Sequence, residues 1–178
     1  MTTDPSPIEI RALDNDGFRA AIPGLAALTV DAVESGSGVN FLAGATEDET
    51  GAWWAARTAA VDAGVVTVFV ARDGDEIVGS TLIERSTNAN SPHRAEIGKV
   101  IVLRRYRRRG IGAALMGAAE ARARADGRWL LILDTVAGSA AEAMYRDLGW
   151  TAFGVVPNHA LLPDGTPAAT TYFWKDLR

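Results

Sequence analysis

The chain has 178 residues, 48% of them hydrophobic and 22% charged, which is the composition of a single globular domain spanning 1–178. Cysteine is absent, which excludes disulfides, thiolate metal sites and a cysteine nucleophile. The net charge of -4 argues against nucleic acid as the main partner, and no apolar run approaches the roughly 20 residues of a membrane helix. Segment 1–5 lacks the basic and apolar regions of a secretory signal, so we expect no membrane association and a cytoplasmic location.

The first half of the chain predicts a strand, two helices and a β-hairpin, in that order. Apolar and polar residues alternate in the first strand, and β-branched residues dominate the second. Pro23 and Gly24 predict an interruption of the first helix, and Asp73–Asp75 is the signal for the hairpin turn. We expect strand 8–12, helix 16–33, helix 46–63, strand 65–71 and strand 76–84.

The second half of the chain predicts a strand, a helix, a strand, a helix and two closing strands. The nearly continuous apolar run 130–133 indicates a strand covered on both faces. Gly149 ends the last helix, and Asp164–Gly165 turns the chain between the closing strands. We expect strand 95–103, helix 110–125, strand 129–134, helix 139–148, strand 152–156 and strand 169–175. This order of elements is that of a single mixed α/β domain.

A candidate anion site lies where strand 95–103 meets helix 110–125. The first N–H groups of a helix have no partner within it, and the dipole there favours a negative charge. Gly110 and Gly112 let a phosphate approach the backbone, and a cluster of arginines can add charge-assisted hydrogen bonds. A solvated basic turn explains the same residues equally simply. The clustered arginines are Arg104, Arg105, Arg107, Arg108 and Arg109.

The motif Arg107-x-x-Gly110-x-Gly112 after an apolar strand resembles the pyrophosphate motif of the GNAT N-acetyltransferase superfamily. The resemblance implies a single-domain α/β (α+β) fold, with a mixed sheet of six to seven strands and about four helices. It also implies acetyl-CoA as co-substrate, with Val102 on the thioester or pantetheine arm and the surplus arginines near the 3′-phosphate. The residues it assigns to acetyl-CoA are Val100, Ile101, Val102, Arg107, Arg108, Arg109, Gly110, Ile111, Gly112, Ala113 and Tyr145.

Two carboxylates are candidates for the general base, and the sequence leaves the choice open. Strand alternation predicts that Glu96, Gly98, Val100 and Val102 share one face. Glu96 also stands eleven residues before Arg107, as the base glutamate does in the histone-acetyltransferase branch that this motif resembles. A solvent-exposed glutamate at a strand edge is the plainer interpretation of Glu96.

Asp134, the second candidate, ends a buried strand, where carboxylates often line the crevice of an open sheet. A cap for the next helix is the alternative role for Asp134, but Ser139 suits that role better. The stretches 93–100 and 133–145 resemble the tabtoxin-resistance acetyltransferases, which acetylate an amino-acid-like toxin. By that resemblance, Asp134 and Tyr145 match residues implicated in catalysis.

Tyr145 is the candidate general acid. Its surroundings resemble the family motif Ala-x-x-x-Tyr-x-x-x-Gly-Phe/Tyr, in which the tyrosine hydroxyl can protonate the coenzyme sulfur. A core aromatic at helical spacing is the alternative. One position departs from the family pattern, because Gly138 stands where an asparagine is often found.

We expect direct transfer of acetyl from acetyl-CoA to a primary amine of a small molecule, with no metal. The alternatives are acetylation of a protein N-terminus or lysine, a non-catalytic acetyl-CoA sensor, and a nucleic-acid binder that uses the arginine cluster. Either a monomer or a homodimer is compatible with the sequence. Two further expectations concern packing: Glu120 and Arg124 pair on an outer helix face, and only one of Trp53 and Trp54 faces inward.

Overall fold

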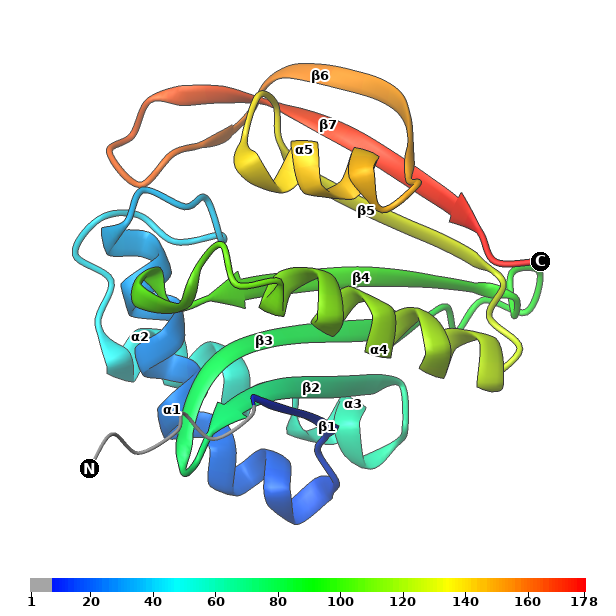
Figure 1. Ribbon diagram of the computed structural model, residues 1–178, viewed down its shortest axis with the longest axis horizontal. Coiled ribbons are helices and arrows are strands. Elements are labelled where there is room, and N and C mark those ends of the chain that lie inside the picture. Colours follow the sequence, from blue (N-terminus) through cyan, green and yellow to red (C-terminus); the bar gives the residue numbers. More distant parts are fainter. Residues whose placement is uncertain (1–7) are drawn as a thin grey trace.

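The computed structural model describes residues 8–178, which form one seven-stranded sheet between two layers of helices (Figure 1). The strand order is β1-β2-β3-β4-β5-β7-β6, and every neighbouring pair is antiparallel except β4 and β5. The predicted mixed sheet is therefore confirmed. Segment 1–5, where we predict no secretory signal, lies outside the described residues. The strands are β1 (Glu9–Ala12), β2 (Val66–Asp73), β3 (Glu76–Arg85), β4 (Arg94–Val102), β5 (Leu130–Val136), β6 (Thr151–Leu161) and β7 (Pro167–Asp176).

Helices cover both faces of this sheet. In Figure 1, α4 and α5 lie in front of the strands, and α1 lies behind them. Each of α1, α2 and α5 begins at a side-chain cap, supplied by Asp14, Thr46 and Ser139 respectively, so the predicted cap for α5 is confirmed. The helices are α1 (Asn15–Glu34), α2 (Glu47–Ala55), α3 (Thr58–Asp62), the 3₁₀ turn η1 (Arg104–Tyr106), α4 (Ile111–Ala125) and α5 (Ala140–Asp147).

Two predictions about the continuity of helices are wrong. Helix α1 continues through Pro23, because Pro23 lies on the solvent side while Gly24 fits tightly against Ile77. The expected helix 46–63 is split into α2 and α3 near Arg57. The guanidinium of Arg57 donates to the carbonyl oxygen of Trp53 at 3.1 Å, while its amide turns to the carbonyl of Trp54 at 3.0 Å. This tighter bond ends the α-helical pattern of α2.

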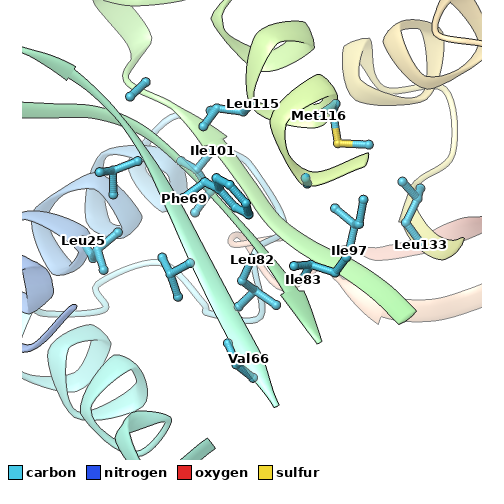
Figure 2. Packing of buried hydrophobic residues seen from close by; sticks show 14 of the residues in the cluster. Leu25, Val66, Phe69, Leu82, Ile83, Ile97, Ile101, Leu115, Met116 and Leu133 are labelled. Atoms are coloured by element: carbon cyan, nitrogen blue, oxygen red, sulfur yellow. The ribbon is translucent and has the colours of Figure 1, made fainter. Parts of the chain in front are cut away.

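The hydrophobic core has one layer on each face of the sheet (Figure 2). Leu25 represents the α1 side, and Leu115 and Met116 represent the α4 side; all three are almost fully buried. Trp54 is completely buried and donates its indole N–H to a threonine of α1, whereas Trp53 is half-buried. The expectation that only one of these two tryptophans faces inward is confirmed.

The expected outward pair of Glu120 and Arg124 is wrong. Glu120 is buried, and its carboxylate accepts hydrogen bonds from Lys175 Nζ at 2.8 and 2.9 Å and from Trp150 Nε1 at 3.0 Å. In an alanine-rich helix the small residues do not specify a face, so Ile111, Leu115 and Met116 decide which side is buried. The resulting contacts join α4 to β7.

Strand β6 is longer than the expected 152–156, since it pairs with β7 over Thr151–Leu161. The predicted turn at Asp164–Gly165 is confirmed, with the amide of Gly165 donating to the carbonyl of Leu162 at 2.9 Å. The β6–β7 hairpin thereby extends beside the cleft described below. Among the helices of the described chain, none combines the length and apolar character that crossing a membrane requires.

Candidate active site

The two parallel strands at the centre of the sheet separate and open a cleft. Strands β4 and β5 are paired only over three residues each, from the Arg94–Leu130 pair to the Glu96–Ile132 pair. Beyond Glu96 the two strands diverge (Figure 1). A cavity of about 1110 Å³ fills the opening. Its walls come from β4, the start of α4, β5, α5, the loop after α1 and the β6–β7 hairpin. Crevices at the carboxyl ends of parallel strands commonly bind ligands, so this cavity is the candidate active site.

The cavity gathers most of the residues singled out from the sequence. Glu96, Asp134 and Tyr145 all line it. Arg109 does not reach it, because its guanidinium donates to the carbonyl of Arg105 at 3.0 Å. The predicted coenzyme residues in the wall are Val100, Ile101, Val102, Arg107, Arg108, Gly110, Ile111, Gly112, Ala113 and Tyr145.

A β-bulge in β4 shapes the middle of the cavity. Lys99 has a positive φ of 52° at this point, where the pairing of β4 with β3 shifts. The hydroxyls of Ser80 and Thr81, both fully buried, donate to the carbonyls of Lys99 at 3.1 Å and Gly98 at 3.2 Å. These bonds replace the regular ladder and fix the bulge, which turns the Lys99 segment toward the cavity.

The bulge overturns one predicted arrangement. Gly98 pairs with Leu82, but Ile101 rather than Val100 pairs with Ser80. Because paired residues point to the same side of a sheet, Glu96 and Gly98 share a face with Ile101, and Val102 lies on the other face. The expectation that Glu96 and Val102 share a face is therefore wrong. A bulge adds one residue to a strand, and alternation counted along the sequence does not register it.

The start of α4 offers unpaired backbone donors. No amide from Arg108 to Ala113 donates to a protein acceptor within the described chain, and the first helical bond runs from Ala114 to the carbonyl of Gly110. Arg108 and Gly110 have positive φ angles of 64° and 78°, which gives the turn the concave form of an anion-binding nest. This helix also lacks the side-chain cap found on α1, α2 and α5. The amides are thus available to an anion.

Gly112 keeps this turn accessible at its tightest point. A Cβ atom at Gly112 would lie 3.0 Å from Met144 Sδ and 3.9 Å from Val102 Cγ2. Glycine is thus the residue that lets the start of α4 approach α5 and β4 so closely without crowding the free amides.

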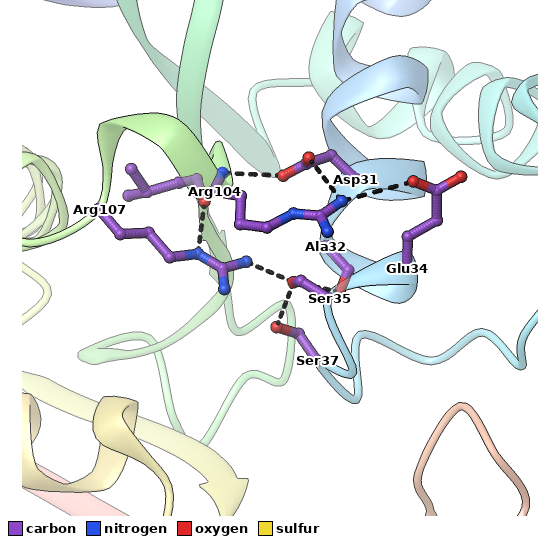
Figure 3. Close-up of polar contacts among 8 residues, drawn as sticks. Asp31, Ala32, Glu34, Ser35, Ser37, Arg104 and Arg107 are labelled. Atoms are coloured by element: carbon purple, nitrogen blue, oxygen red, sulfur yellow. Dashed lines mark hydrogen bonds and ion pairs between the residues drawn. The ribbon is translucent and has the colours of Figure 1, made fainter.

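The arginines near the turn divide into structural and available ones. Figure 3 shows Arg107 donating from Nε to the carbonyl of Val102 at 3.0 Å and from Nη2 to Ser35 Oγ at 2.6 Å. Arg104 pairs with Asp31 and Glu34 of α1 in the same view. Both side chains therefore join the turn to the end of α1.

The two arginines beside Tyr106 are also engaged, whereas Arg108 is not. Arg105 forms an ion pair with Glu76, and Arg109 lies with its guanidinium carbon 4.9 Å from the ring centre of Tyr106. Arg108 is exposed, lines the cavity and has no ion pair or side-chain hydrogen bond within the described residues. The surplus arginines of the sequence thus reduce to one free guanidinium at the cavity.

Three carboxylates gather on the other side of the cavity. Glu96 lies opposite Glu84 across β3 and β4, and Asp134 lies on the facing strand β5. Partial burial raises the pKa of Glu96, and the negative charges of Asp134 and Glu84 raise it further, against a smaller opposing effect of Arg94. A carboxylate with a raised pKa accepts a proton more readily, which is the property of a general base.

Tyr145 faces this group from α5. Its ring is buried between Trp150 and Phe173, at centroid distances of 6.3 and 6.0 Å. Burial raises the pKa of the Tyr145 hydroxyl, and the negative charge of Asp134 adds to the effect. The hydroxyl therefore remains protonated across the ordinary pH range and is available as a donor.

Comparison with known proteins identifies the family. A sequence model of the acetyltransferase (GNAT) family matches residues 39–150, well over half of the chain. The chain belongs to the GNAT acetyltransferase family. The matched range contains the bulge, the free amides of α4, both candidate bases and Tyr145. The chain is therefore a GNAT N-acetyltransferase with acetyl-CoA as co-substrate.

Solved GNAT structures match over nearly the whole chain. An N-acetyltransferase from Staphylococcus aureus Mu50 has a TM-score of 0.78 at 18% identity, covering 97% of this chain and 100% of its own. A Salmonella typhimurium protein, solved with its cofactor acetyl-CoA, has a TM-score of 0.76 at 19% identity, covering 97% and 95%. A ribosomal-protein-alanine N-acetyltransferase from Brucella melitensis has a TM-score of 0.72 at 25% identity, covering 95% and 99%. The GNAT fold predicted from the sequence is confirmed.

The residues at the turn fit the anionic part of acetyl-CoA. Its diphosphate needs several donors close together, and the unpaired amides from Arg108 to Ala113 provide them without a competing side-chain cap. Arg108 adds a free guanidinium beside them.

Sequence reasoning missed a second group of residues in the wall of the cavity. Arg57, Lys99 and Asn40 line it together with Trp53. Asn40 lies in the loop after α1, and the positive φ of Lys99 has no sequence signal, so neither was predictable. Only the i, i+4 spacing of Trp53 and Arg57 could have indicated their contact.

His159 of β6 also lines the cavity. Its Nε2 atom lies 2.8 Å from the hydroxyl oxygen of Tyr172, in hydrogen-bond contact. His93 stacks on Trp129 with ring centres 4.4 Å apart. His93 is therefore partly covered, and it is not among the residues that line the cavity.

Proposed function

We propose that this GNAT enzyme transfers the acetyl group of acetyl-CoA directly to the primary amine of a small molecule. The observation that carries the proposal is the separation of β4 from β5 beyond Glu96. That single opening joins the unpaired amides of α4 to the carboxylates Glu96 and Asp134 and to Tyr145. The absence of cysteine leaves no thiol for an acetyl-enzyme, which favours direct transfer.

The donor side of the reaction depends on the backbone. Acetyl-CoA supplies a thioester whose carbonyl carbon is open to attack by an amine. The amides from Arg108 to Ala113 hold its diphosphate, and the diverging end of β4 directs its pantetheine arm toward the bulge at Lys99. Backbone N–H groups near Val102 stabilise the negative charge that develops on the carbonyl oxygen.

The acceptor side depends on proton transfer. Glu96 or Asp134 takes a proton from the attacking amine, directly or through a water molecule, as the new C–N bond forms. Tyr145 donates a hydrogen bond and then its proton to the sulfur as the C–S bond breaks. The raised pKa of Tyr145 keeps that proton in place until the sulfur becomes negative.

Two observations favour a small acceptor. The loop after α1 and the β6–β7 hairpin both wall the cavity and meet where the amide of Ala43 donates to the carbonyl of Pro163 at 2.8 Å, which suits a compact molecule. The resemblance of 93–100 and 133–145 to the tabtoxin-resistance group also favours an amino-acid-like amine. A protein N-terminus is the second candidate, because the Brucella melitensis relative at 25% identity is a ribosomal-protein-alanine N-acetyltransferase.

A free-thiol release assay with acetyl-CoA and a panel of amines tests the proposal. The panel contains amino acids, polyamines, an aminoglycoside, an alanine-initiated peptide and a lysine-containing peptide. We expect one of the small amines to accelerate thiol release well above hydrolysis without an acceptor. Preference for the alanine-initiated peptide supports the second candidate instead. Tight acetyl-CoA binding without acceleration by any amine contradicts both and supports a sensor.

A further inference from the structure

Two cations at the acceptor end of the cavity lack carboxylate partners. Arg57 from the α2–α3 junction and Lys99 from the β4 bulge both line the cavity, and neither forms an ion pair within the described chain. Glu84 favours the charged form of Arg57, and Asp134 favours that of Lys99, but neither carboxylate comes within ion-pair distance. The two cations are therefore exposed to each other and to whatever occupies the cavity.

Trp53 and Asn40 hold these two cations in place. The guanidinium carbon of Arg57 lies 3.1 Å from the centre of the Trp53 ring, and Arg57 Nη1 donates to the Trp53 carbonyl. Lys99 Nζ lies 4.4 Å from the centre of the same ring and donates to Asn40 Oδ1 at 2.5 Å. One aromatic side chain thus fixes both positive groups, and each retains further donors for a ligand.

The arrangement costs free energy in the unliganded protein. Burial lowers the pKa of Lys99 to about 8, and the positive charge of Arg57 contributes to that decrease. Lys175 provides a contrast within the same chain, because it is likewise half-buried but is neutralised by Glu120 at 2.8 Å. Lys175 is thus paired with a carboxylate, whereas Lys99 is left beside a second cation.

We propose that Arg57 and Lys99 form a subsite for a carboxylate of the acceptor, so that the acceptor is a zwitterionic amino acid or a close analogue. The inference rests on the proposed function and makes its acceptor more specific. The cations bind the carboxylate, and Glu96 and Asp134, which line the same cavity, receive the amine. A planar guanidinium and an ammonium together provide donors for both carboxylate oxygens.

Matched acceptors and matched variants test the subsite. Each amino acid of the panel is compared with its α-amide and with its decarboxylated amine, in the wild type and in Arg57→Gln and Lys99→Met. Arg122→Gln is the control, because Arg122 pairs with Asp126 on the exposed side of α4. Unchanged acetyl-CoA affinity and an unchanged circular dichroism spectrum establish that each variant is folded.

We expect the wild type to prefer the amino acid over its amide and its decarboxylated amine. In Arg57→Gln and Lys99→Met the KM for the amino acid rises about 10- to 100-fold, as the loss of a charge-assisted hydrogen bond predicts. The kcat at saturation changes little, and the amide is affected far less than the acid. Equal rates for acid, amide and amine in the wild type overturn the inference, as does an equal loss for acid and amide in Arg57→Gln.

A binding measurement separates this inference from the proposed function. Calorimetry with coenzyme A present compares an N-acetyl amino acid with its amide, and needs no turnover. Stronger binding of the acid that is lost in Arg57→Gln supports the subsite even if no amine is acetylated. Acetylation of amines together with no preference for the acid, in binding and in kinetics, overturns the subsite and leaves the proposed function standing.

Discussion

The donor half and the acceptor half of the cavity are built in different ways. The donor half is centred on one continuous segment, Arg107–Ala113, whose amides from Arg108 onward donate to no acceptor in the described chain, and the helix that follows has no side-chain cap. The acceptor half is assembled from side chains of the α1–α2 loop, the α2–α3 junction, the β4 bulge, β5 and the β6–β7 hairpin. Under the function proposed above, the first construction serves the common co-substrate, and the second selects the acceptor.

The difference has an electrostatic side as well. The donor half presents helix amides and the guanidinium of Arg108, which all favour a negatively charged ligand. The acceptor half contains carboxylates and unpaired cations together, including Glu96, Asp134, Arg57 and Lys99. Such a mixed site selects by the relative position of charges rather than by net charge. Substitutions in the two halves should therefore affect different kinetic constants.

The largest expected effect is on the general base. We expect one of Glu96→Gln and Asp134→Asn to lower kcat roughly 10²- to 10⁴-fold, because the amine then has no proton acceptor in place. The measurement is kcat and kcat/KM against pH for both variants. Glu9→Gln, an exposed position on β1, is the control and should retain wild-type rates.

The pH profile distinguishes the two carboxylates. If Glu96 is the base, activity falls as the pH drops through its pKa, which lies above the ordinary value of 4.5. Because the charge of Asp134 raises that pKa, Asp134→Asn should shift the acidic limb of the pH profile to lower pH. The loss of activity at acidic pH should still be present in this variant. If both variants lose no more than a few-fold, neither carboxylate is the base.

Loss of the Tyr145 hydroxyl comes next in size. Tyr145→Phe keeps the buried ring between Trp150 and Phe173, so we expect a folded protein with nearly unchanged acetyl-CoA affinity. The kcat should fall roughly 100-fold, at the lower end of the range for loss of a proton donor. Rapid kinetics of thiol release under single turnover measures the step directly. A wild-type rate in this variant rejects the acid role.

A substitution at Gly112 should affect the donor half alone. Gly112→Val places carbon atoms against Met144 Sδ and beside the free amides, so acetyl-CoA affinity should fall about 30-fold, roughly 2 kcal/mol. Gly117→Ala in the same helix is the matched control, because a Cβ there meets nothing within 4 Å. Calorimetric titration with coenzyme A compares the two. Equal affinities in Gly112→Val and the wild type would exclude the turn as the diphosphate site.

The donor half was largely predictable from the sequence, because its chemistry lies in adjacent residues. The strand, the spacing of Arg107, Gly110 and Gly112, and the helix that follows together define a backbone arrangement with few alternatives. The arginine side chains were less predictable. Arg104 and Arg107 are used to bind α1, a contact between segments about 70 residues apart that no local pattern encodes.

The acceptor half could be predicted only in part. Glu96, Asp134 and Tyr145 were found by their place at strand ends or in a family motif, and the structure brings them to one cavity. The bulge at Lys99 was missed, because its cause is the pair of buried hydroxyls on the neighbouring strand. Glu120 was misplaced for a similar reason, since its partner Lys175 lies 55 residues away. Both misses are tertiary contacts that override local periodicity.

The smallest expected effect is on stability, and it tests most directly whether the acceptor half contains a cation that is unfavourable in the absence of a ligand. Lys99→Met should raise the free energy of unfolding at pH 7 even as it weakens acceptor binding. Below pH 8 the lysine is charged in both folded and unfolded chains, and its burial beside Arg57 is unfavourable only in the folded one. The difference between pKa values of 10.5 and about 8 corresponds to about 3 kcal/mol. Loss of the Asn40 hydrogen bond and the Trp53 contact offsets part of it, which leaves a net gain of about 1 kcal/mol.

The pH dependence of this gain gives the decisive measurement. Between pH 8 and 10.5 the unfolded wild-type chain holds a proton that the folded chain has released, so wild-type stability rises with pH in that window. The advantage of Lys99→Met should therefore shrink over the same window in urea titrations. A Lys175→Met variant should instead be destabilised at pH 7, because it leaves the buried carboxylate of Glu120 without its cation. If both methionine variants lose stability alike, Lys99 is a structural residue, and the acceptor half holds no cation set aside for a ligand.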